Sequence, residues 1–145
     1  MEMTKERLAA YRSNRQEIKE LEYTLNNRWK DERMIGNDVI LDYSVSYPPR
    51  AQSVVGFDQE RYERLQDRDN KRIELLKAEC KEIEDFVERI KDSTTHRIFR
   101  AYYIDGEKNV AQNQVADQMH MDRSRISRRI DNYLKNAHKS QKAHL

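Results

Sequence analysis

The stretch MHMDRSRISRRI, residues 119–130, places four arginines within seven positions. An arginine guanidinium presents a planar set of N–H donors that matches phosphate oxygens and the O6 and N7 edge of guanine. We therefore predict that this stretch contacts a nucleic acid through both phosphates and base edges. The predicted contact residues here are Arg123, Ser124, Arg125, Ser127, Arg128 and Arg129.

The same residues open an amphipathic helix. Asp122 is its expected N-cap, and Ile126, Ile130 and Leu134 recur at intervals of four residues. One face should therefore be buried, with the polar residues on the remaining surface. Arginines in the first turn oppose the helix dipole, so they do not stabilise the helix itself. A solvated charged face is the simpler interpretation, but the clustering of arginine and serine favours contact with an anion.

Two shorter helical segments precede this helix. The first, HRIFRAYYIDG, can be capped by Thr94 or Thr95, and the second spans about residues 109–119. A turn at His120 and Met121 then leads to the arginine-rich helix. This order is typical of a helix-turn-helix, whose second helix enters the major groove while the first crosses the backbone. The first helix of that pair is expected to hold phosphates through Gln112, Asn113 and Gln114.

The front of the chain predicts two long helices, at about residues 4–34 and 59–92. Their apolar residues recur in steps of three, four and seven, which is typical of a coiled-coil seam. Asp58 is the expected N-cap of the second helix, whose apolar seam is formed by Tyr62, Leu65, Ile73, Leu76, Cys80, Ile83, Val87 and Ile90. Because neither helix would be stable alone, we expect an antiparallel helical hairpin that also forms a homodimer. A long loop at 36–57 joins the two helices, and its short alternating pieces leave pairing as extended segments open. Trp29 is expected to be a packing anchor, with contact to a partner as the alternative, and Asp69 is expected to be a polar interruption of the seam.

Composition supports an all-α fold class. With 3 Gly, 2 Pro and 37% charged residues, the chain fits long helices better than a large globular core. We expect a hairpin at 1–92 followed by a three-helix module at 93–145. The charge divides at the same place. Residues 93–145 hold 10 Lys and Arg against 5 Asp and Glu, a net of +5, whereas residues 1–92 hold 18 against 21, a net of −3.

Several other kinds of site are not expected. The single cysteine, Cys80, excludes an intrachain disulfide and fits a reducing cytoplasm. No stretch approaches the roughly 20 apolar residues of a membrane span, so we expect no membrane partner. The sequence has no glycine-rich phosphate loop and no spacing of metal ligands. We therefore expect no enzymatic activity, no cofactor and no metal.

Three segments together span nearly the whole chain: MTKERLAAYRSNRQEIKELE; then NDVILDYSVSYPP followed by VVGFD; and IEDFVERIKDSTTHRIFRAYYIDGEKNVAQNQVADQMHMDRSRISRRI. Their order and spacing resemble the RinA/ArpU-type transcriptional regulators of phages and prophages in Gram-positive bacteria, whose C-terminal part resembles the DNA-binding region 4 of sigma factors. The resemblance implies contact with double-stranded DNA at the start of the last helix and control of phage genes, often late or packaging genes. It leaves open whether host RNA polymerase is contacted.

The function predicted from the sequence is thus sequence-specific DNA binding in the regulation of phage or prophage transcription. An alternative is a phage packaging or assembly adaptor, which also combines a DNA-binding helical module with an oligomerising hairpin. A ring of about eight or more subunits would favour that adaptor over a regulator, which should be a monomer or dimer. A third hypothesis is a coiled-coil adaptor that binds no nucleic acid.

Overall fold

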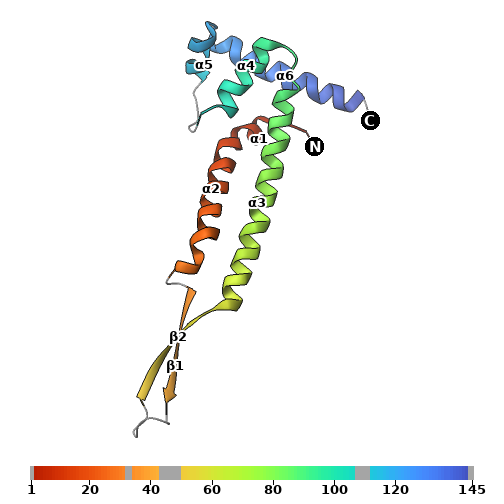
Figure 1. Cartoon of the computed structure of the whole chain (residues 1–145). Coiled ribbons are helices and arrows are strands. Elements are labelled where there is room, and N and C mark those ends of the chain that lie inside the picture. The colour runs from red at the N-terminus through yellow and green to blue at the C-terminus, as the bar shows by residue number, and fades with distance from the viewer. Residues whose placement is uncertain (1, 32–33, 43–49, 107–111, 144–145) are drawn as a thin grey trace. The chain divides into compact units, whose positions relative to one another are not determined.

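The computed structural model describes residues 2–31, 34–42, 50–106 and 112–143, and most of them are helical (Figure 1). The elements are α1 (Lys5–Ala9), α2 (Tyr11–Asn27), the short 3-10 helix η1 (Arg28–Lys30), β1 (Ile35–Asp42), β2 (Arg50–Phe57), α3 (Gln59–Glu88), α4 (Ser93–Phe99), the π-helical turn η3 (Arg100–Ile104), α5 (Gln112–Met119) and α6 (Arg123–Ala143). The expected helical character is confirmed.

The chain divides into two compact units. Unit 1 contains Met1–Ile18 and Leu75–Leu145, and unit 2 contains Lys19–Glu74. The first helical turns of the chain therefore belong with the basic C-terminal helices. This grouping depends on contacts between residues far apart in the sequence, described next.

In unit 1, α1 and the start of α2 are tied to the second half of α3 by charged side chains. Arg7 pairs with Glu79 and Glu82, with N–O distances of 2.7 and 2.8 Å. The Tyr11 hydroxyl donates to a carboxylate oxygen of Glu84 at 3.0 Å. Arginine with two carboxylates holds both in fixed geometry, because its guanidinium offers several donors in one plane.

Arg12 ties the same segment to η3. Its side chain is only 8% exposed and donates to the main-chain carbonyls of Ala101, Tyr102 and Asp105, the first two at 3.2 and 2.8 Å. The last carbonyls of a helix lack partners within it, so a buried cation at this position satisfies them. Residues 1–18 are thus part of the unit that carries the predicted DNA-binding residues.

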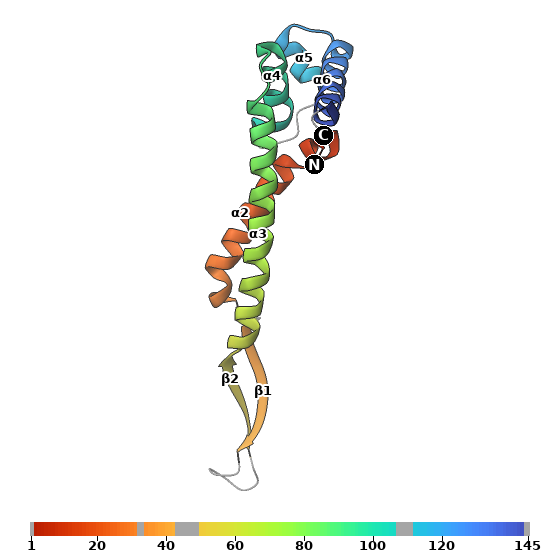
Figure 2. The ribbon, with the colours of Figure 1, turned by 90° about the vertical axis from the view of Figure 1, so that its right-hand side faces the viewer.

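The loop expected at 36–57 contains two antiparallel strands, seen together in Figure 2, so the all-α prediction misses one element. The pairing runs from Ile35 opposite Phe57 to Asp42 opposite Arg50. The β-branched residues of this segment favour extended backbone, which is the physical reason for the difference. Of the alternating residues that left pairing open, those from Tyr43 to Tyr47 lie outside the described residues.

α3 matches its prediction closely at its start and along its buried face. The Asp58 carboxylate accepts from the Arg61 N–H at 3.1 Å, which confirms Asp58 as the N-cap. The predicted seam is buried at Ile73, Leu76, Cys80, Ile83, Val87 and Ile90. The helix ends at Glu88 rather than at 92, because the chain turns there and the Ile90 N–H donates to the Val87 carbonyl.

Unit 2 has a buried ion pair in place of an apolar contact. Asp69, 4% exposed, pairs with Arg28, 6% exposed, and Arg28 also donates to the Gln66 side chain at 2.6 Å. Asp69 thus interrupts the seam as expected, with a partner the sequence did not indicate. Trp29 was expected to be a packing anchor, but it is 59% exposed. The buried side chain of this turn is its neighbour Arg28.

The pKa of Asp69 is lowered. Burial opposes its charged form, but hydrogen bonds from Arg68 and Arg28 outweigh that effect. An aspartate whose pKa is lower in the folded state stabilises that state above its unfolded pKa of about 4. The contribution is lost as the pH falls through the folded-state value.

We predict that Asp69→Ala lowers the free energy of unfolding at neutral pH by about 3 kcal/mol, because it leaves the Arg28 guanidinium buried without its counter-charge. Denaturant unfolding followed by circular dichroism measures this. Asp67→Ala, at an exposed position of the same helix, should change it little. The deficit of the Asp69 variant should shrink below about pH 4. Equal, small losses in both variants would contradict the role of the ion pair.

Candidate nucleic-acid interface

A three-residue turn at 120–122 joins α5 to α6. The His120 N–H donates to the Asp117 carbonyl at 3.3 Å, and the Met121 N–H donates to the Ala116 carbonyl at 2.9 Å. With His120 in the left-handed region at φ 54°, these bonds form a Schellman motif at the end of α5. Glycine is usual at this position, but histidine is one of the residues enriched there. The turn thus closes tightly without glycine.

Apolar packing sets the rotation of α6 about its own axis. Ile126 and Ile130 are 0% and 1% exposed, and Leu134 is also buried. The ring of Tyr133 lies edge-on to Phe99, with centroids 5.4 Å apart. Because successive helical residues are offset by about 100°, burying these side chains directs the arginines of the helix away from the core.

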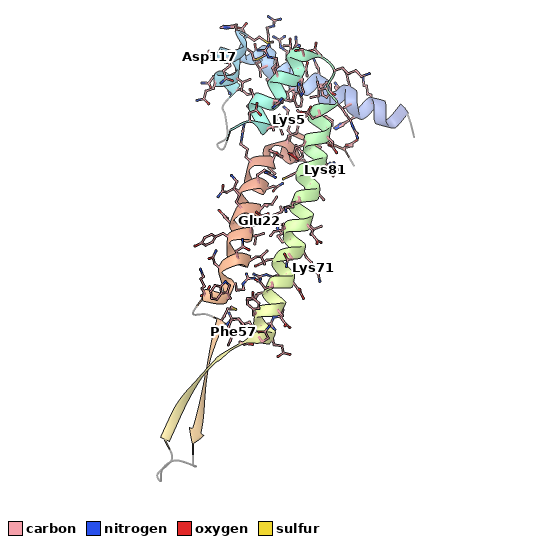
Figure 3. All side chains as sticks on the ribbon, viewed as in Figure 1. Lys5, Glu22, Phe57, Lys71, Lys81 and Asp117 are labelled. Carbon is pink, nitrogen blue, oxygen red and sulfur yellow. The ribbon has the colours of Figure 1, made fainter. Side chains whose placement is uncertain are left out.

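One flank of α6 is covered by the N-terminal segment. Lys5 pairs with Asp131, and the Nε2–H of His138 donates to the Met3 carbonyl at 2.7 Å. Met3 itself is buried. Figure 3 labels Lys5, the first residue of α1, close to the C-terminal helices. This flank of the helix is therefore occupied by the protein itself.

The other flank is open and forms a pocket of about 530 Å³. It contains three of the four predicted arginines and no acidic residue among its lining side chains, which are Thr95, Met121, Arg125, Arg128, Arg129, Asn132, Tyr133 and Asn136. The pocket is thus a concentration of guanidinium and amide groups on one face of one helix. Such a surface is suited to an anionic partner that offers many acceptor oxygens.

Most of the guanidinium groups remain available to an outside partner. Arg123 and Arg125 are exposed, and neither makes a hydrogen bond or ion pair with the described part of the chain. Arg128 is exposed too, and its Nε donates only to the Ser124 carbonyl of its own helix, at 3.3 Å. These three arginines therefore form no ion pair with acidic groups of the described part of the long helices.

Arg129 differs from the other three. Its Nη1 lies 3.0 Å from a carboxylate oxygen of Asp92, which is also the N-cap of α4. That carboxylate accepts from the Thr95 hydroxyl and N–H, and these bonds, with Arg129 nearby, lower the pKa of Asp92. The prediction that Thr94 or Thr95 caps α4 is therefore wrong, because Asp92, one residue before the helix, accepts both Thr95 protons.

The remaining predicted contact residues lie outside the pocket. Ser124 and Ser127 are on α6 but do not line it, and Arg123 precedes it in the first turn. The three polar residues Gln112, Asn113 and Gln114 are at the start of α5. They do not line the pocket in the described structure. Their contact with a long ligand stays a prediction.

Two pocket residues, Asn132 and Asn136, are missing from the sequence prediction. Together with Arg125 and Arg129 they occupy positions spaced by four, three and four residues, which align along one side of an α-helix. This spacing is the sequence feature that could have indicated Asn132 and Asn136 as residues of the same surface. Charge does not point to them, because an asparagine amide is neutral and the arginine cluster lies in the earlier turns of the helix.

Other kinds of site find no support within the described residues. No group of three or more His, Cys, Asp or Glu side chains there could hold a metal ion. None of the helices in that part of the chain has the length and apolar character needed to span a membrane. Cys80 is buried, and burial raises the pKa of its thiol, which disfavours the reactive thiolate.

Comparison with known proteins adds no relative to this description. No protein-family model, curated protein or solved structure matches the chain.

We predict that His120→Gly raises the free energy of unfolding by about 0.5–1 kcal/mol, because glycine adopts the left-handed conformation without a Cβ clash. His120→Val should lower it, since a β-branched residue is strained there. Thermal and denaturant unfolding of the two variants measure the difference. If valine is tolerated as well as glycine, the turn does not have the conformation described.

Proposed function

We propose that the chain is a sequence-specific DNA-binding regulator of transcription, in which α5 and α6 act as a helix-turn-helix and α6 enters the major groove. The observation that carries this proposal is the open pocket lined by Arg125, Arg128 and Arg129, among which Arg129 alone pairs with a carboxylate of the described residues, that of Asp92. Arginine forks bind phosphate oxygens and guanine edges, and B-form DNA presents both along a groove that admits an α-helix.

Charge supports a polyanionic partner over a small one. Residues 93–145 carry a net charge of +5, and the arginines extend along α6 beyond the pocket to Arg123. A duplex has one negative charge for about every 1.7 Å of its axis, so a row of cations meets a row of phosphates. A single small anion would leave most of these groups without a partner.

The remaining parts of the proposal concern assembly and biological setting. We propose that α2 and α3 form an antiparallel helical hairpin that supports a homodimer, which would present two reading heads to two half-sites. The exposed Tyr23, Trp29 and Phe57 of unit 2 support self-association, because they leave large aromatic surfaces uncovered. The resemblance to RinA/ArpU-type regulators supports phage or prophage genes as the target, action in the host bacterial cytoplasm, and host RNA polymerase as a further candidate partner.

We predict that the protein binds duplex DNA of mixed sequence at low salt, and that replacing both Arg125 and Arg128 by alanine abolishes most of this affinity. Fluorescence anisotropy across a series of salt concentrations measures it. The dependence of log affinity on log salt should become shallower by about one for each phosphate that the variant no longer neutralises. Arg64→Ala, an exposed arginine of α3, is the matched control and should bind as the parent does. Parental affinity in the double variant, or no binding at all by the parent, would contradict the proposal.

We also predict that Asp92→Asn strengthens DNA binding. Asparagine keeps the α4 N-cap, because its side-chain oxygen can still accept from Thr95, but it removes the negative charge that pairs with Arg129. The released guanidinium should raise affinity several-fold and steepen the salt dependence. The same anisotropy titration measures both quantities. Unchanged affinity with an intact fold would show that Arg129 takes no part in DNA contact.

A further inference from the structure

The polar face of α6 continues for two turns beyond the arginines, and it does so with amides. Asn132 and Asn136 are exposed and line the same pocket as Arg125, Arg128 and Arg129. Neither amide makes a hydrogen bond within the described part of the chain. If this cationic face bound phosphates alone, lysine or arginine at these two positions would increase its affinity. The presence of two exposed asparagines instead therefore requires a chemical explanation.

An asparagine side chain offers a carbonyl acceptor beside an amide donor. A phosphate accepts hydrogen bonds and donates none, so the carbonyl oxygen of an asparagine gains nothing from it. The major-groove edge of adenine presents an acceptor at N7 next to a donor at N6, and this pair matches the amide in bidentate fashion. Asparagine on this face is thus better suited to a base edge than to the backbone.

The position of Asn132 on the helix agrees with that role. At about 100° per residue, Arg128 lies about 40° to one side of Asn132 and Arg129 about 60° to the other. An α-helix in the major groove turns the centre of its exposed face to the base edges and its sides to the two phosphate strands. Asn132 is at the centre, with a guanidinium on each side.

We infer that Asn132 is a specificity-determining residue that reads the edge of an adenine, and that Asn136 makes the equivalent contact one turn further along. This inference rests on the DNA binding proposed above. The two residues are separated by about 6 Å along the helix axis, which corresponds to about two base-pair steps of DNA. The preferred duplex therefore contains A·T pairs at two positions about two steps apart, beside the pairs contacted by the arginines.

Selection from a pool of duplexes with random central sequence tests the inference on the full chain. The parent protein should enrich an A·T pair at a defined position, and Asn132→Ala should lose the preference at that position alone. We expect a loss of about tenfold in affinity for the selected duplex, with little change for random duplexes. Asn132→Asp should shift the preference at that position toward cytosine, because a carboxylate accepts from the cytosine N4 amine. Asn70→Ala, at an exposed position of α3, should select the same duplexes as the parent.

The outcomes separate this inference from the proposal on which it rests. If Asn132→Ala enriches the same base at every position as the parent, Asn132 does not read sequence, whereas DNA binding stands. If the parent binds the pool but enriches no sequence, the surface holds the backbone only and the inference fails. If the parent does not bind the pool at low salt, DNA binding fails and the inference fails with it. Circular dichroism spectra that match the parent show that the asparagine variants are folded.

Discussion

The rotational setting of α6 is the constraint on which the candidate site depends. Ile126 and Ile130 are almost completely buried, so a rotation of the helix by one residue would expose them and turn the arginines toward the core. The pairing of Lys5 with Asp131 and the hydrogen bond from His138 to the Met3 carbonyl place the N-terminal segment along one flank of the helix. Hydrophobic burial and this cover together leave a single flank free. All the guanidinium and amide groups of the pocket lie on that flank, so the buried side chains of α6 and the N-terminal segment determine which residues of the helix remain accessible to a partner.

Features with a local signature were predicted well from the sequence. The cap at Asp58 follows from residue type and position, and the buried stripe of α3 follows from a period near 3.6. The same reasoning identified the buried residues of α6. Features that depend on long-range contacts were not predicted. In the sequence, Arg12 is one of many charged residues of an amphipathic helix, and nothing there indicates that it is buried. In the structure it is buried against main-chain carbonyls of η3, some 90 residues later in the chain. For that reason the division into compact units does not follow from the sequence pattern.

In the candidate site, too, features with a local sequence pattern could be predicted, and features that depend on long-range contacts could not. Charge and spacing indicated the arginines, but the sequence could not show which of them are already paired. Arg129 differs from Arg125 only because Asp92 lies beside it, and that proximity comes from the packing of α4 against α6. Asn132 carries no charge and gave no signal alone. The role that we propose for Asn132 rests on its place in a pocket lined by three arginines. The sequence alone does not establish the two-stranded element, because short alternating segments do not distinguish a β-ribbon from a loop.

The open flank of α6, and not its covered flank, is the surface that we expect to meet DNA. A nuclear magnetic resonance titration of the labelled full chain with a mixed-sequence duplex at low salt tests this most directly. We expect the largest shifts on the side-chain N–H signals of Arg125, Arg128 and Asn132, with small changes at Asp131 and His138. Shifts concentrated at Asp131 and His138, or along α3, or no shifts at all, would contradict this assignment.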